Sequence, residues 1–151
     1  MRIIRYSLLL ATSYVLISCA SFKNEGLDDF YKKYDQEIVS MRLPKMLFQF
    51  NDAHKELKPL KKYLKASRFA MIENANSKML HDLDKALKND RYEEYISINN
   101  EGNLITLLAA ENNEKITHIV CKINESEEVV LLQARVDLPL DKFQEIISSL
   151  N

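Results

Sequence analysis

The residues best suited to chemistry form the tetrapeptide Leu16-Ile17-Ser18-Cys19 near the start of the chain. A cysteine thiol that follows a small residue and an apolar pair can take a diacylglycerol group through a thioether bond. Cleavage between Ser18 and Cys19 then leaves Cys19 as the first residue, with a free amino group for an N-acyl chain. The tetrapeptide has the residue order of the bacterial lipobox, and it therefore predicts signal cleavage at this bond and lipidation of Cys19.

The segment before the tetrapeptide supports this interpretation. Arg2 and Arg5 supply positive charge, and an apolar run of about 12 residues follows from Tyr6 to Ile17. Secretory signals have runs of about 7–15 residues, whereas a membrane-spanning helix needs about 20. An ordinary signal peptide or an uncleaved anchor is the alternative.

The expected organisation has three parts. We expect residues 1–18 to be a lipoprotein signal peptide, residues 19–26 the lipidated cysteine and a short polar tether, and residues 27–151 a single domain. Two or three acyl chains hold a protein firmly in a bilayer, so the expected location is the cell envelope. In the sorting rule known for many Gram-negative lipoproteins, an Asp after the cysteine retains the protein at the inner membrane, so Ala20 favours the outer membrane. Lipoproteins exported to the cell surface often carry an acidic signal directly after the cysteine. Here the first acid is Glu25, and this favours the periplasmic side.

Composition excludes several classes of site. Glycine occurs at only two of the 151 positions, which excludes glycine-rich phosphate loops. With Cys19 lipidated, Cys121 stands alone, so we expect neither an intramolecular disulfide nor a paired-cysteine metal site. Loss of Arg2 and Arg5 takes the net charge from −1 to −3, which gives no reason to expect nucleic acid as a partner. We expect no cofactor apart from the diacylglycerol and N-acyl lipid on Cys19.

The other reactive side chains form no catalytic pattern. His81 precedes Asp82 and Asp84 on an expected helix, and this spacing is more typical of a surface pair than of an acid–base site. Cys121 lies among apolar residues of an expected strand, which predicts an inert thiol. His54, His81 and His118 have no metal-binding spacing, so we expect no metal, no catalytic residue and no enzymatic activity.

A lysine-rich stretch is the most unusual local feature. Its basic residues include Lys55, Lys58, Lys61, Lys62 and Lys65, and leucines at helical spacing predict a short helix over 55–65. A solvated helix face is the ordinary interpretation. The sharper hypothesis is contact with anionic headgroups near the lipid anchor, where each lysine contributes about 1 kcal/mol.

Periodicity predicts the remaining elements. Helices are expected over 27–36, after Pro44, after Asn74 or Asn76, and from Pro139 to the end. Strands are expected over 37–43, 67–73, 92–99, 103–111, 115–124 and 128–137, the last four joined by short polar turns. The fold class is therefore α+β: a single mostly antiparallel sheet, made of a C-terminal four-strand meander plus two earlier strands, with helices packed on it.

One expected strand is apolar on both sides. Ile119, Cys121 and Ile123 are expected on one face of strand 115–124, with Ile116 and Val120 on the other. This pattern is typical of a strand that is covered on both faces.

Several short motifs carry a family resemblance. They are Leu27-Asp28-Asp29-Phe30, Val39 to Lys45, Tyr92 to Ile96, Ile119-Val120, Val129 to Leu132, and Asp137-Leu138-Pro139-Leu140. In this order and spacing, after the motif at Cys19, the chain resembles the small Bacteroidetes-type lipoproteins of domain-of-unknown-function family 4252. The resemblance implies a fold and export, and it implies no activity and no site residue.

The expected function is a non-enzymatic envelope lipoprotein that binds another envelope protein or senses the state of the envelope. Its expected partners are the membrane, through the anchor, and an envelope protein. The alternative is a small-molecule or lipid-binding lipoprotein with a pocket between sheet and helices. Its candidate lining residues are Phe30, Tyr31, Tyr34, Phe69, Met71 and Met79.

Overall fold

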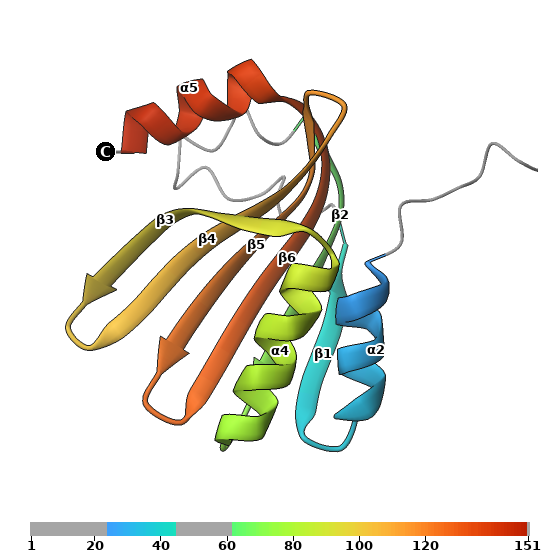
Figure 1. Ribbon diagram of the computed structural model, residues 1–151, viewed down its shortest axis with the longest axis vertical. Coiled ribbons are helices and arrows are strands. Elements are labelled where there is room, and N and C mark those ends of the chain that lie inside the picture. Colours follow the sequence, from blue (N-terminus) through green and yellow to red (C-terminus); the bar gives the residue numbers. More distant parts are fainter. Residues whose placement is uncertain (1–23, 45–61, 151) are drawn as a thin grey trace, which may run out of the picture.

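One antiparallel sheet organises the molecule. The computed structural model describes residues 24–44 and 62–150. Its elements are α2 (Glu25–Lys33), β1 (Ile38–Leu43), β2 (Leu64–Ile72), α4 (Ser77–Asn89), β3 (Tyr92–Asn100), β4 (Asn103–Asn112), β5 (Lys115–Glu125), β6 (Glu128–Pro139) and α5 (Leu140–Leu150). The six strands are ordered β1-β2-β6-β5-β4-β3 (Figure 1). The predicted α+β class and antiparallel sheet are confirmed.

The last four strands form the predicted meander. Asn100 pairs with Asn103, so the turn from β3 to β4 consists of Glu101 and Gly102, both with positive φ. Between β4 and β5 the two turn residues also have positive φ. Two-residue turns of this kind match the twist of antiparallel strands, which explains why short polar connections suffice here.

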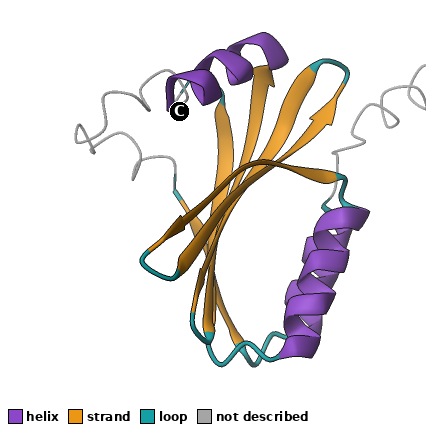
Figure 2. Ribbon diagram, turned by 60° about the vertical axis from the view of Figure 1, so that its left-hand side comes forward, coloured by secondary structure: helices purple, strands orange, loops and turns teal. Residues whose placement is uncertain are grey.

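Helices α2 and α4 cover one face of the sheet (Figures 1 and 2). Their buried side chains meet those of the strands in the larger core, which includes Leu27, Phe30, Leu83, Leu87, Ile72, Ala110, Val120 and Leu131. Asn76 caps α4, because its side-chain oxygen accepts a hydrogen bond from the backbone N–H of Met79 at 3.0 Å. We call this surface of the sheet the helix face.

Helix α5 packs on the opposite face, at one end of the sheet. Phe143 is buried there, and its ring meets that of Tyr95 edge to face with centroids 4.9 Å apart. A smaller core forms around this pair, and it includes Ala109, Ile116, Val136 and Leu138. An irregularity in pairing between Ile116 and His118 reverses the alternation of β5, so Ile116 shares this face with Ile119. The expectation that they lie on opposite faces was wrong.

Three predicted boundaries were wrong for physical reasons. Leu64 and Lys65 belong to β2 and not to a helix, because Leu64 pairs with Val136 of β6. This strand pairing stabilises the extended backbone more than the helical spacing of the leucines stabilises a helix. Pro139 is the last residue of β6, and α5 begins one residue later. Helix α2 begins at Glu25, so the end of the expected tether is part of the fold. The helix expected after Pro44 lies outside the described residues.

Candidate functional site

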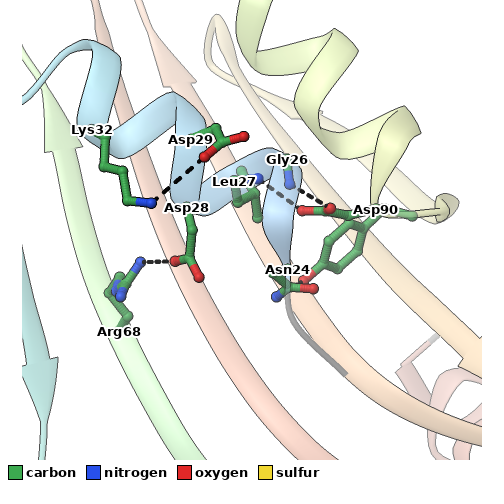
Figure 3. A network of polar contacts seen from close by, with 9 residues as sticks. Asn24, Gly26, Leu27, Asp28, Asp29, Lys32, Arg68 and Asp90 are labelled. Carbon is green, nitrogen blue, oxygen red and sulfur yellow. Dashed lines mark hydrogen bonds and ion pairs between the residues drawn. The ribbon is translucent and has the colours of Figure 1, made fainter. Parts of the chain in front are cut away.

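The first turn of α2 is fixed by a carboxylate that is distant in sequence (Figure 3). Asp90 follows the end of α4, and its two oxygens accept hydrogen bonds from the backbone N–H groups of Gly26 and Leu27 at 2.7 and 2.8 Å. These donors lack partners within a helix, and a negative charge at this end is favourable. Burial raises the pKa of Asp90. The contact therefore joins the N-terminal end of the described domain to α4.

A second polar contact ties α2 to the sheet. Arg68 of β2 forms an ion pair with Asp28 at 3.0 Å, and its guanidinium lies over the ring of Tyr31, 4.8 Å from the centroid. Burial raises the pKa of Tyr31 to about 12, although the charge of Arg68 opposes this shift. A phenol with so high a pKa stays neutral at physiological pH, so Tyr31 is a poor general base, and its contact with Arg68 serves to position α2.

Asn24 completes this junction. Its side-chain amide donates a hydrogen bond to the Tyr92 hydroxyl at 2.9 Å, and both residues are buried. Burial raises the pKa of Tyr92 well above the usual range. The junction of Asn24, Arg68, Asp90 and their neighbours thus has a structural role, which is to hold the start of α2 against α4 and the sheet.

A second candidate is the part of the sheet that α5 leaves uncovered. Two rows of side chains cross all six strands on the α5 side, and each row joins residues that are paired in register. In sheet order the first row is Met41, Phe69, Leu132, Cys121, Leu107 and Ile96. The second row is Val39, Met71, Val130, Ile123, Ile105 and Ile98. Every member is apolar or a cysteine, and we call these twelve residues the apolar rows.

Exposure shows that the apolar rows form a surface. Val39 and Met41 are each 53% exposed, Ile98 is 51% exposed and Leu132 is 41% exposed. The other eight members are half-buried. Among the described residues, one further large apolar side chain is exposed, Leu104 at 37%, and it lies on the helix face. Contiguous exposed apolar patches larger than a few hundred Å² are uncommon on monomeric proteins, so this surface is a candidate binding site.

Comparison with known families shows that this surface lies within a domain matched by a family model. The model of the family described as domain of unknown function DUF4252 matches residues 31–146, which is well over half of the chain. The chain belongs to the DUF4252 family. The matched range contains both apolar rows, whereas Asn24 and Gly26 of the junction precede it. No curated protein matches this DUF4252 chain.

Most of the predicted site residues lie outside the described part of this DUF4252 protein. They are Ser18, Cys19, Lys55, Lys58 and Lys61. Lys62 and Lys65 are described, and both are exposed. Lys62 lies over the ring of Tyr63, 4.7 Å from its centroid, and Lys65 lies at the irregularity where β2 begins to pair with β6. No helix in the described ranges is long and apolar enough to cross a membrane.

The histidine cluster considered from sequence does not assemble. Asp82 binds the Tyr34 hydroxyl at 2.6 Å and forms an ion pair with Lys33, and these contacts lower the pKa of Asp82 to about 2. Asp84 pairs with Lys122 at 3.0 Å. Both carboxylates therefore have other partners, and His81 is exposed. Within residues 24–44 and 62–150, no group of three His, Cys, Asp or Glu side chains could hold a metal ion.

Two further side chains are poor candidates for chemistry. Burial lowers the pKa of His118 to about 4, and the charge of nearby Arg135 acts in the same direction, so His118 is neutral at physiological pH. Cys121 is a free, half-buried thiol in the apolar rows, and burial raises its pKa. A raised pKa lowers the thiolate fraction, which agrees with the inert thiol predicted from sequence.

The six candidate pocket-lining residues do not meet in one place. Phe30, Tyr31, Tyr34 and Met79 are buried in the larger core on the helix face. The rings of Phe30 and Tyr34 are in contact, with centroids 5.1 Å apart. Phe69 and Met71 belong to the apolar rows on the opposite face. One pocket between sheet and helices cannot be lined by all six.

The sequence contains a signal for the apolar rows. The apolar residues on both sides of β5 predict that both of its faces are covered. The same two-sided pattern occurs in β6 and β4, with Val130 and Leu132 in one and Ile105 and Leu107 in the other. Only the register between strands shows that these residues align into continuous rows, and that α5 covers just one end of them.

Proposed function

We propose that this DUF4252 protein is an exported lipoprotein that is held in the cell envelope by lipid on Cys19. Its domain binds another envelope protein and does not catalyse a reaction. The observation that carries the binding role is the surface formed by the apolar rows. Burying exposed apolar surface contributes about 25 cal/mol per Å², so the four exposed members of the rows and the remaining exposed area of the eight half-buried ones supply a driving force for association.

The position of Asn24 supports anchoring at a defined end of the domain. Asn24 lies on the helix face near the start of β3, at the end of the sheet where α5 also lies. Lys62 and Lys65 lie at the start of β2, at the same end. A bilayer that holds Cys19 would therefore be near two exposed lysines, and each contributes about 1 kcal/mol of attraction to anionic headgroups.

The anchor is tested by metabolic labelling with an alkyne-bearing fatty acid. The wild-type chain is expected to take up the label and to fractionate with the outer membrane, and Cys19→Ala is expected to lose both properties. Protease added to intact cells is expected to leave the domain uncut, because it faces the periplasm. Retention of Cys19→Ala in membranes washed with high salt would contradict the anchor.

The binding role is tested with a matched pair of variants. Leu132→Glu places a charge in the apolar rows, and Leu104→Glu places the same charge at an apolar residue of similar exposure on the helix face. Proteins that co-purify with the wild-type chain from chemically cross-linked envelopes are expected to be lost with Leu132→Glu and kept with Leu104→Glu. Equal recovery with both variants would show that the apolar rows do not bind the partner.

A further inference from the structure

The apolar rows are followed by an acidic border at the end of the sheet away from α5. Glu125 and Glu128 pair with each other and lie two residues beyond Ile123 and Val130, so they continue the same face. Glu37 and Glu73 adjoin the paired residues Ile38 and Ile72 at this end of the sheet. All four of these glutamates are exposed. We call them the acidic border; no lysine or arginine stands in it or in the apolar rows.

The dimensions of the uncovered surface match one helix. Neighbouring strands are about 4.8 Å apart, so six strands span about 24 Å, and successive rows on one face are about 7 Å apart. A helix has a diameter of about 10 Å and rises 1.5 Å per residue, so about 16 residues would cross the sheet. Helix α5 already covers the adjoining part of this face (Figure 2), and parallel helices pack 8–10 Å apart.

We propose that the apolar rows bind an amphipathic helix of a second protein, about four turns long, beside α5. Its apolar stripe packs on the rows, and lysine or arginine residues along one flank face the acidic border. This proposal rests on the binding role given above and adds the chemistry of the partner. Opposite charges at the rim of an apolar contact orient the partner and speed its association.

Charge and position both argue against a bilayer as the occupant. Anionic headgroups would meet the four glutamates of the acidic border, and like charges repel. Asn24 is on the helix face, and the five peptide steps from Cys19 reach at most about 18 Å. The apolar rows lie on the other side of the sheet. A second copy of this chain fits poorly too. Its apolar rows have the same acidic border and contain no lysine or arginine, so two such surfaces would bring like charges together.

The proposal is tested by photo-cross-linking of the full-length protein in its own envelope. Benzoylphenylalanine replaces Leu132 in one variant and Leu104 in the matched control, and mass spectrometry identifies the peptide attached to each. From position 132 we expect one segment of another protein, with an apolar stripe at helical spacing and an excess of lysine and arginine. Position 104 is expected to give at least 10-fold less of this product.

Charge reversal then tests the acidic border. In the cross-linking variant at 132, replacing Glu125 and Glu128 by lysine is expected to lower the yield of that product at least fivefold. Lysines in place of Glu111 and Glu114, at the opposite end of the sheet, are expected to leave the yield unchanged. Glu111 and Glu114 are exposed, as Glu125 and Glu128 are, and each double variant changes the net charge by the same amount.

Each other outcome overturns the inference. Attachment to lipid would identify a membrane surface, and attachment to a second copy of this chain would identify self-association. If the attached segment is acidic, or if its yield is unchanged when Glu125 and Glu128 are replaced by lysine, the binding role stands but the proposed chemistry of the partner is refuted. Lack of fatty acid on Cys19 would refute the anchor alone.

Discussion

Gly26 offers the sharpest test of how the domain is built. In the first turn of a helix, replacing glycine by alanine is normally stabilising, because alanine has the higher helix propensity by about 1 kcal/mol. Here the structure predicts the opposite sign. A Cβ atom at position 26 would lie 2.6 Å from the carbonyl oxygen of Ala86 and 2.9 Å from Asp90 Oδ1.

The expected cost follows from what must move. Ala86 is in α4, so its carbonyl cannot yield as a flexible side chain can, and α2 must shift away from α4. That shift weakens the bonds from Gly26 and Leu27 to Asp90, and a buried donor without a partner costs about 1–3 kcal/mol. Loss of both bonds would cost about 2–6 kcal/mol, and after the gain in propensity of about 1 kcal/mol Gly26→Ala is expected to destabilise the fold by about 1–5 kcal/mol.

Urea unfolding of the chain from Ala20 onward, followed by circular dichroism, measures this cost. Asp90→Ala is the companion variant, with an expected loss of about 2–6 kcal/mol because both N–H groups lose their acceptor. The two losses are expected to be far from additive, since each variant breaks the same contact. A chain with Gly26→Ala that is as stable as the wild type, or more stable, would falsify the close packing of α2 on α4.

Three further outcomes are expected. Leu131→Ala, at a position 1% exposed in the larger core, should cost about 2–5 kcal/mol in urea unfolding, whereas Leu132→Ala next to it in the apolar rows should cost under about 1 kcal/mol; equal losses would contradict the face assignment. His118 has a pKa of about 4 in the fold, below its unfolded value of about 6.5. The free energy of unfolding should therefore be highest above pH 6.5 and fall by up to about 3 kcal/mol as the pH drops towards 4. This loss should be absent in His118→Gln, and NMR titration of the ring checks the pKa. Cys121 should react with iodoacetamide at pH 8 more than 10-fold more slowly in the folded chain than in urea, as followed by mass spectrometry, and equal rates would show an open thiol.

The parts of the fold that depend on local signals could be predicted from the sequence. Alternating residues and polar turns located β3 to β6 to within two residues, because two-residue turns need only local backbone geometry. The helix that Asn76 caps was found in the same way. The match over residues 31–146 confirms that the chain belongs to the DUF4252 family, whereas the Bacteroidetes lipoprotein type stays a prediction.

The parts that depend on distant partners could not be predicted. Helix α2 begins at Glu25 because Asp90, more than 60 residues later, accepts the hydrogen bonds of its first turn. Leu64 joins β2 because Val136 offers it a pairing position. The apolar rows also depend on residues that are distant in sequence, since Phe69 and Leu132 become neighbours only when β2 pairs with β6. Local periodicity carries no information on such pairings.

The start of α2 also sets how far the proposed anchor would let the domain travel. If Cys19 carries the lipid, five peptide steps separate it from Asn24, and these span at most about 18 Å. A domain held this closely would search a thin layer along the bilayer and not the full depth of the periplasm. A partner in the same membrane would share this thin layer, so its local concentration near the apolar rows would exceed its average over the whole periplasm.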